Sequence, residues 1–201
     1  YWFKFEPIDW RILDSSTGLI MCEAIIDSQP YSNTLYSRGS GTYDYFNDYS
    51  QNYYANDYKT SSIRKWLNED FYYTAFSPSE REDIKIATLN NDGYNTSIDV
   101  SGYEALDSEK TNDKIFLLSY NEVINNKYGF SSNSKDCDVA RIAKGSDYAK
   151  SQGLYVANGN SYWTLRSPGD VSYNSCRIST AGCAESYNGV NNAYYGVRPA
   201  M

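Results

Sequence analysis

The pattern of apolar and polar residues predicts β-strands at both ends of the chain. Residues 2–13 alternate roughly between apolar and polar positions, residues 14–18 form a turn cluster, and residues 19–26 are a second apolar run. These features favour an N-terminal β-hairpin. From Tyr155 onward, short strand-like pieces alternate with Gly, Asn and Ser turns. We expect the two ends to meet in antiparallel sheet.

Two main helices are predicted in the first half of the chain. Hydroxyl residues 60–62 can cap a helix whose apolar positions share one face, namely Ile63, Trp66, Leu67 and Phe71. Residues 77–80, Ser-Pro-Ser-Glu, combine a capping box with proline at the first helical position. This second helix is expected to run toward Ile86.

The remaining segments predict long loops and smaller elements. Residues 32–59 and 90–114 are polar and loop-like, and residues 115–118 read as a short buried strand. Ser119 starts another capping box, which predicts a brief helix to Asn126. A short helix over residues 146–152, closed by Gly153, is also expected. The sequence therefore predicts a single α+β domain over residues 1–201.

Composition and charge narrow the classes of partner. Hydrophobic residues make up 41% of the chain, and tyrosine, with 22 residues, outnumbers the other aromatics. The net charge of −7 disfavours nucleic acid and anionic lipid. No run approaches the roughly 20 apolar residues of a membrane span, so we expect no membrane insertion by this domain. The chain starts at Tyr1 without a targeting segment, which suggests a fragment or processed form.

The absence of histidine argues against catalysis. Ser-His and Cys-His triads and the commonest metal ligand are excluded. Neighbouring carboxylates such as Asp136 and Asp138 are typical of a solvated surface, and no phosphate-binding or EF-hand loop is present. We expect no required cofactor. An oxygen-only calcium site, built from Asp136 and Asp138 or from the loop with Asp44, Asp48 and Asp57, stays an open alternative.

The four cysteines do not have the spacing of a zinc site. Cys22 lies in an apolar run and is expected to be a small buried side chain. If residues 179–182 form a turn, Ile178 faces Cys183, and Cys176 comes within diagonal reach of it. A disulfide between Cys176 and Cys183 is therefore a candidate, and two unpaired thiols are the alternative.

Several sequence strings carry a resemblance to a known family. They are Trp-Thr-Leu-Arg-Ser-Pro-Gly at residues 163–169 and Gly-Val-Arg-Pro-Ala at residues 196–200, with shorter matches along nearly the whole chain. The chain resembles a bacterial domain-of-unknown-function family related to C-type-lectin-like folds. The resemblance implies a C-type-lectin-like α+β fold with Trp10, Trp66 and Trp163 in the core. Arg166 and Arg198 are expected to bind backbone carbonyls or a buried carboxylate.

Strings of Tyr, Asn and Ser near the C-terminus predict a binding face. Rigid amphipathic rings and adaptable hydrogen-bonding groups are typical of antibody paratopes. The candidate ligand-binding residues are Tyr173, Asn174, Ser175, Arg177, Ser179, Tyr187, Asn188, Asn191, Asn192 and Tyr194. The structural alternative is that these residues are ordinary turns with tyrosine anchors.

These observations lead to one leading functional hypothesis. The chain is expected to be a non-catalytic module, extracellular or on the cell surface, that binds a protein or glycan. The resemblance extends to variable proteins of diversity-generating retroelements, which use the same fold and vary near the C-terminus. The alternatives are a purely structural surface domain and an oxidase like the formylglycine-generating enzymes. Such an oxidase would need Cys176 and Cys183 as a reactive pair.

Overall fold

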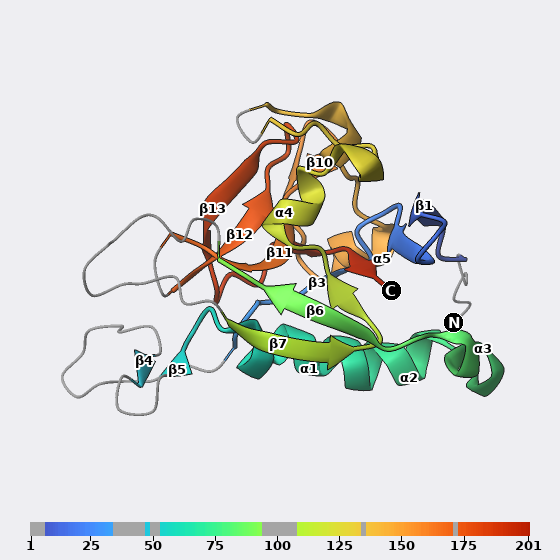
Figure 1. Ribbon diagram of the computed structural model, residues 1–201. Coiled ribbons are helices and arrows are strands. Elements are labelled where there is room, and N and C mark those ends of the chain that lie inside the picture. The colour runs from blue at the N-terminus through green and yellow to red at the C-terminus, as the bar shows by residue number, and fades with distance from the viewer. Residues whose placement is uncertain (1–6, 34–46, 49–52, 94–107, 134–135, 171–172) are drawn as a thin grey trace.

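The strands nearest the two ends of the chain share one antiparallel sheet, as predicted (Figure 1). Figure 1 is a computed structural model that describes residues 7–33, 47–48, 53–93, 108–133, 136–170 and 173–201. The sheet has the order β1-β2-β15-β8, with β1 (Trp10–Asp14), β2 (Leu19–Cys22), β15 (Pro199–Ala200) and β8 (Phe116–Leu117). The predicted N-terminal hairpin is confirmed by β1 and β2, and residues 1–6 lie outside the described part.

A second sheet of five strands carries most of the C-terminal half. Its order is β13-β12-β11-β14-β3, with β13 (Ala184–Gly189), β12 (Asn174–Ile178), β11 (Trp163–Pro168), β14 (Gly196–Val197) and β3 (Asp27–Ser28). All pairs are antiparallel except β11 with β14. Three two-stranded ribbons complete the described strands: β4 (Asn47–Asp48) with β5 (Tyr53–Tyr54), β6 (Ala87–Asn91) with β7 (Ser108–Asp113), and β9 (Val156–Ala157) with β10 (Asn160–Ser161).

The C-terminal residues 196–200 belong to both large sheets. Gly196 and Val197 form β14, while Pro199 and Ala200 form β15. A Cβ atom on Gly196 would lie 2.4 Å from Cγ2 of Ile25, so only glycine fits there. This short segment therefore ties the two sheets to each other.

One long helix of 14 residues is present, and the prediction of two main helices is wrong. The long helix comprises α1 (Ser62–Trp66), a π-helical segment η2 (Leu67–Phe71) and α2 (Tyr72–Ala75), and the Ser61 side chain caps its start. The second helix, α3 (Pro78–Asp83), begins with the predicted capping box but has only six residues. It stops before Ile86 because Ile84 is already extended, and β6 begins at Ala87.

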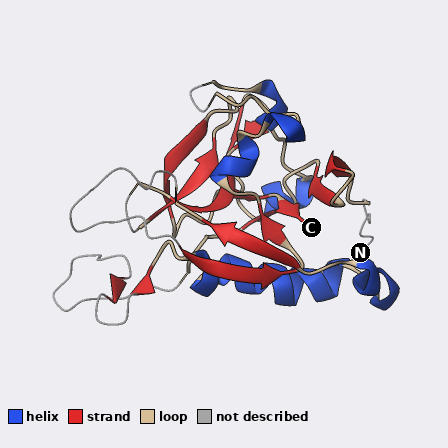
Figure 2. Cartoon of the chain, in the orientation of Figure 1, coloured by secondary structure: helices blue, strands red, loops and turns tan. Residues whose placement is uncertain are grey.

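The smaller helices follow the capping signals in the sequence. Ser119 makes the predicted capping box with Glu122 and starts α4 (Tyr120–Val123). Ser146 caps α5 (Asp147–Ser151), and Gly153 follows it with φ of +100°, as expected of a terminating glycine. Three 3-10 turns are described: η1 (Tyr58–Thr60), η3 (Asn126–Tyr128) and η4 (Val139–Arg141). Figure 2 shows the long helix and α3 along the lower edge of the drawing, with α4 and α5 nearer its middle among the strands.

The prediction of a loop over residues 90–114 is wrong at both ends of that range. β6 and β7 form an antiparallel ribbon there, although residues 94–107 lie outside the described part. Polar residues occupy buried positions of these strands, so the usual alternation of apolar and polar residues is absent. Asn91 donates to the Thr111 hydroxyl at 3.1 Å, and Asp113 accepts from Arg64 at 2.8 Å. The predicted loop 32–59 also contains short elements, while its residues 34–46 and 49–52 are not described.

Buried arginines connect the elements, and the roles expected of Arg166 and Arg198 are confirmed. Arg166 donates to both carboxylate oxygens of Glu122, at 2.5 and 2.9 Å, and to the Leu117 carbonyl at 2.8 Å. Arg198 donates to the Cys22 carbonyl at 2.8 Å, and its guanidinium lies 5.0 Å from the ring centre of Trp163. Each guanidinium thus fixes backbone from a different segment.

The three described tryptophans differ in burial. Trp163 is fully buried and donates its indole N–H to the Arg141 carbonyl at 2.9 Å. Trp10 and Trp66 are only half-buried. The expectation of a core anchor therefore holds for Trp163 and overstates the burial of the other two. Residue Cys22 is a buried free thiol, as predicted.

The disulfide joins Cys137 to Cys183, so the candidate bond between Cys176 and Cys183 does not form. The alternative of two unpaired thiols holds for Cys176 but not for Cys183. Residues 179–182 do form the expected turn, but Ile178 pairs with Ala184 and not with Cys183. A shift of one residue in an antiparallel pair exchanges the two faces of the sheet. Cys176 therefore points into the core as a free thiol, and its sulfur lies 3.3 Å from the Pro168 carbonyl oxygen.

In the part of the chain that the structure describes, no helix is both long and apolar enough to cross a membrane.

Replacing Trp163 with alanine should destabilise the fold by roughly 3–5 kcal/mol, because a large buried side chain and its hydrogen bond are lost. The matched change Trp10→Ala should cost less than about 2 kcal/mol, since that ring is half-buried. Urea unfolding of both variants measures the difference. Equal losses would contradict the burial assigned to Trp163.

Acid should destabilise the protein in part through Glu122. Burial alone would raise the pKa of this carboxyl group, but the charge and hydrogen bonds of Arg166, with those of Ser119, lower it. Because the pKa of Glu122 is lower in the folded state than in the unfolded state, the ionised carboxylate stabilises the fold above about pH 4.5. This stabilisation is lost as the pH falls through the folded-state pKa.

The variant Glu122→Gln should therefore be less stable than the wild type at neutral pH, by about 3 kcal/mol. Its free energy of unfolding should also change less than that of the wild type as the pH is lowered. Urea unfolding at a series of pH values checks both expectations. The exposed capping-box residue Glu80, changed to Gln, serves as the control. An unchanged acid dependence in Glu122→Gln would refute the assignment.

Candidate binding surface

The strands β11, β12 and β13 have one face in the core and one face directed away from it. The inner side chains Trp163, Cys176 and Ile178 are fully buried. Because successive side chains alternate between faces, Thr164, Arg177 and Glu185 belong to the outer face. The register supports this placement, since Arg177 pairs with Thr164 on one side and with Glu185 on the other.

Arg177 lies at the centre of this outer face. Its guanidinium carbon is 4.5 Å from the ring centre of Tyr162, 4.8 Å from that of Tyr187 and 5.1 Å from that of Tyr195. These distances are all within the range of cation–π attraction. Nε also donates to the Glu185 carboxylate at 2.7 Å, and Nη1 donates to the Tyr195 hydroxyl. Arg177 is thus a neutralised and largely enclosed cation.

A chain of ring contacts extends outward from Arg177. Ring centres are 5.8 Å apart for Tyr155 and Tyr162, 5.4 Å for Tyr162 and Tyr195, and 4.7 Å for Tyr194 and Tyr195. Three tyrosines keep large exposed fractions: 49% for Tyr155, 53% for Tyr187 and 45% for Tyr194. We call Arg177 and these five tyrosines (155, 162, 187, 194 and 195) the tyrosine surface.

The connection between β13 and β14 brings the last two tyrosines to this surface. β13 and β14 are separated in the sheet by β12 and β11, so residues 190–195 have to cross both strands. Tyr195 contacts Tyr162 and Arg177, which places the crossing on the outer face. Beside it, the buried Asn188 amide donates to Thr164 at 3.2 Å and to Ser175 at 3.0 Å.

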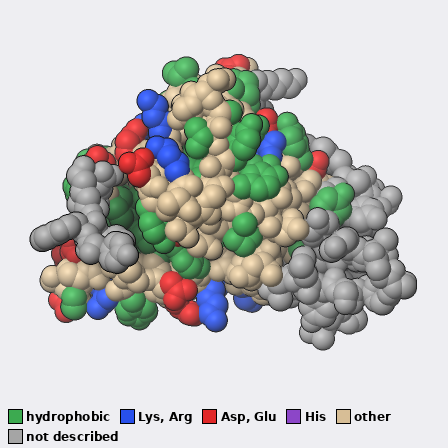
Figure 3. Space-filling view, turned by 180° about the vertical axis from the view of Figure 1, so that it is seen from behind, with side chains coloured by type: hydrophobic (Ala, Val, Ile, Leu, Met, Phe, Trp, Pro, Cys, Tyr) green, Lys and Arg blue, Asp and Glu red, His purple; other side chains and the backbone are tan. Residues whose placement is uncertain are grey.

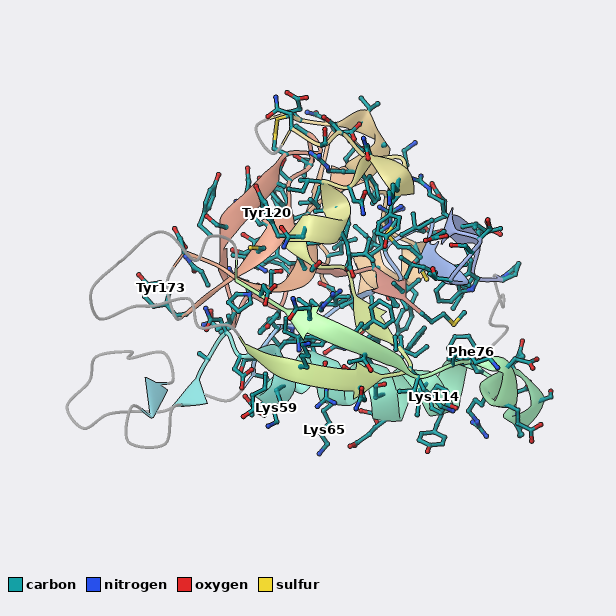
Figure 4. The ribbon with its side chains drawn as sticks, viewed as in Figure 1. Lys59, Lys65, Phe76, Lys114, Tyr120 and Tyr173 are labelled. Carbon is teal, nitrogen blue, oxygen red and sulfur yellow. A yellow bond between two sulfur atoms is a disulfide. The ribbon has the colours of Figure 1, made fainter. Side chains whose placement is uncertain are left out.

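The predicted ligand-binding residues separate into distinct groups. Arg177, Tyr187 and Tyr194 meet in the tyrosine surface. Asn191 is exposed and Asn192 half-buried in the crossing segment. Figure 4 shows Tyr173 far from the centre of the molecule, at the end of β12 opposite Arg177, and Asn174 follows it.

Besides Arg177, three of the predicted residues are buried and hydrogen-bonded within the protein. They are Ser175 and Asn188, which bond to each other, and Ser179, whose hydroxyl accepts from the Cys183 backbone at 3.1 Å. Replacing Asn188 should therefore cost stability, in contrast to the exposed residues around it.

Sequence reasoning missed Tyr155, Tyr162, Tyr195 and Glu185. Tyr195 and Glu185 lie within the Tyr/Asn/Ser strings and could have been included. Tyr162 precedes the buried Trp163, and strand alternation could have placed it outward. No local pattern connects Tyr155 to the others, because its contact with Tyr162 depends on the path of the chain.

At neutral pH the surface offers protonated hydroxyl groups. Burial, the largest cause, raises the pKa of Tyr195 to about 12, although the charge of Arg177 opposes this. Burial also raises the pKa of Tyr187, as does the neighbouring Glu185. Tyrosine hydroxyls in this state can donate and accept hydrogen bonds. Figure 3, which views the molecule from the side opposite to Figure 1, shows hydrophobic side chains (tyrosine included) scattered among uncharged side chains and backbone.

The acidic candidates for a calcium site are engaged in local hydrogen bonds. Asp136 accepts from Ser131 and Asn133, and Asp138 accepts from the Ser131 and Ala140 backbone. Asp57 caps η1, whereas Asp44 lies outside the described residues, as does the side chain of Asp48. Within the described residues, no group of three or more potential metal ligands occurs.

The comparisons with known proteins give one family. The family described as a domain of unknown function, DUF6273, matches residues 16–201. No curated protein and no solved structure matches the chain. The match covers both large sheets from β2 onward, including the Trp163 and Arg198 segments. The chain therefore belongs to the DUF6273 family.

Proposed function

We propose that this chain is a non-catalytic recognition module, exported or displayed on a cell surface, that binds a protein or glycan through the tyrosine surface. The observation that carries the proposal is the enclosure of Arg177 by the rings of Tyr162, Tyr187 and Tyr195. The exposed rings of Tyr155 and Tyr194 pack outside this group, against Tyr162 and Tyr195. Tyrosine combines a large apolar ring with a hydroxyl group at low entropic cost, which suits binding surfaces. Neither catalysis nor a cofactor is part of this proposal.

The rings are held in place without a ligand, and this supports a binding role. Arg177 contacts three rings and is itself fixed by Glu185. A surface whose side chains are already ordered loses less entropy when a ligand binds. The amides of the exposed Asn191 and the half-buried Asn192 in the crossing segment can then supply adaptable hydrogen bonds.

A C-type-lectin-like fold and variation by a retroelement form the finer part of the proposal. The pairing of the N-terminal β2 with the C-terminal β15 supports such a fold. The sequence strings that carry the resemblance are buried at Trp163 and Arg198, whereas Tyr187 and Tyr194 between them are exposed. Such a division suits a fixed scaffold with variable contacts. Retroelement variation would be supported by two features of the neighbouring DNA: a reverse transcriptase gene and a near-copy of the region that encodes residues 163–201. The absence of both would count against it.

The disulfide supports the proposed location outside the cell. Cys137–Cys183 is the kind of bond that persists in oxidising compartments. The alternative oxidase would need Cys176 and Cys183 as a reactive pair. Cys183 is bonded to Cys137, and Cys176 is buried with its pKa raised well above the ordinary value by desolvation. The cysteine arrangement therefore favours the binding proposal.

Replacing Tyr187 or Tyr194 with alanine should separate binding from stability. The free energy of unfolding should change by about 0.5 kcal/mol or less, because both rings are exposed. Binding should weaken by about 2 kcal/mol or more if the rings are interface anchors. Thermal melts and a glycan and surface-protein array, followed by titration of the hit, measure the two effects.

Tyr73→Ala is the matched control, since Tyr73 is exposed on α2, outside the tyrosine surface. This control should keep wild-type binding. If Tyr187→Ala and Tyr194→Ala unfold as readily as Trp163→Ala, or bind as the wild type does, the proposed binding surface has to be abandoned.

A further inference from the structure

A separate groove lies between residues 29–33 and the first turns of the long helix. Its volume is about 420 Å³, within the range of small-ligand pockets. Trp66, Pro30 and the edge of Ile63 supply apolar lining, while Gln29, Lys65 and Asp70 are among its polar lining. No residue of the tyrosine surface borders this groove.

The π-helical segment determines how Trp66 faces the groove. The Tyr72 backbone N–H reaches the Leu67 carbonyl, five residues earlier, as in a π-turn. This turn brings Phe71 behind Trp66, and the two rings stack with centres 5.4 Å apart and planes 23° apart. In a regular α-helix, positions five apart are about 140° apart around the axis and would not stack. The π-turn therefore supports the indole from behind while the indole lines the groove.

An interaction outside the groove holds the π-turn in place. The Asn68 side chain accepts from the Lys114 backbone at 3.0 Å and donates to the Ile115 carbonyl at 2.8 Å. It also donates to the Arg64 carbonyl, one turn back in the helix, at 3.1 Å. Side-chain insertion of this kind accompanies irregular helical turns. π-turns are frequent at functional sites, and here the turn shapes one wall of a groove.

Some polar groups of the groove are available to a ligand, although the Ser61 and Ser62 hydroxyls bond within the protein. The Gln29 amide makes one long bond, to Asp27 at 3.4 Å, which leaves its second N–H for a ligand. Among the described residues, none accepts a hydrogen bond from the Trp66 indole, and none donates one to the Asp70 carboxylate. Lys65 has only a long contact with Glu69, at 3.9 Å, and Figure 4 shows it pointing away from the molecule. The opposite charges of Lys65 and Asp70 balance, so the groove favours a neutral ligand.

We propose that this groove binds one sugar residue of a neutral saccharide. A sugar ring can place its C–H groups against the half-buried indole and its hydroxyls against the planar groups of Gln29 and Asp70. Hydroxyl groups accept from amide N–H and donate to carboxylate oxygen, with the stronger bond to the charged group. Most residues that line the groove are polar, which fits a hydroxyl-rich ligand better than an apolar one.

The backbone around the groove argues against an extended peptide as the occupant. Strand addition needs free backbone groups, but the N–H groups of Gln29 and Ser32 bond to Tyr195 and Val190, and Tyr31 accepts from Ile63. The groove therefore offers mainly side chains. This inference does not depend on the tyrosine surface, since the two sites share no residue.

The test follows the indole N–H signals of the 15N-labelled protein by NMR. The Trp66→Phe variant assigns the Trp66 signal, and Trp10→Phe assigns a half-buried indole outside the groove. The probes are the methyl glycosides of glucose, galactose and N-acetylglucosamine, each added to about 100 mM because single sugars bind weakly. A short polyproline peptide is the comparison ligand.

At least one glycoside should shift the Trp66 signal saturably while the Trp10 signal stays constant. Asp70→Asn should weaken this binding at least threefold, Glu69→Gln should leave it unchanged, and added salt should have little effect on a neutral ligand. Tyr187→Ala should leave the response intact, which separates this site from the tyrosine surface. The proposal is overturned if no glycoside moves the Trp66 signal, if Trp10 responds equally, or if only the peptide binds.

Discussion

The structure depends on the insertion of one short C-terminal segment into both large sheets. Gly196 and Val197 complete the five-stranded sheet, and Pro199 and Ala200 complete the four-stranded sheet. Arg198 lies between them, is fully buried and bonds to the backbone of β2 and the residue after it. Burial lowers the pKa of Arg198 to about 10, so the charge persists at neutral pH. Loss of this segment would therefore detach β8 from β2 in one sheet and β3 from β11 in the other.

The same constraint connects the scaffold to the tyrosine surface. Because β14 pairs with both β11 and β3, the preceding residues have to cross β12 and β11. They do so on the outer face, where they bring Tyr195 to Arg177 and Tyr194 against Tyr195. The arginine attracts rings from three separate segments and keeps its own charge paired with Glu185. The proposed binding role thus rests on side chains positioned by the fold and ordered in advance.

Features with a local signal could be predicted from the sequence, whereas those that depend on distant contacts could not. The capping boxes at Ser77 and Ser119 act within four residues, and both were found. The disulfide partner of Cys183 is 46 residues away, and the β6–β7 ribbon buries Asn91, so neither has a local pattern. Of the binding surface, Tyr187, Tyr194 and Arg177 were predicted, but their convergence through Tyr162 and Tyr155 depends on the sheet order.

The central claim is that the tyrosine surface is already ordered around Arg177 before any ligand binds. The NMR spectrum of the Arg177 side chain in the ligand-free protein measures this most directly. Ring currents from Tyr162, Tyr187 and Tyr195 should move its δ-methylene protons strongly upfield, and its Nε–H should exchange slowly because it bonds to Glu185. In Arg177→Lys, the tyrosine ring signals should broaden or shift, since an ammonium group cannot stack between the rings. Random-coil shifts and fast exchange at Arg177 in the free protein would contradict a surface formed before the ligand arrives.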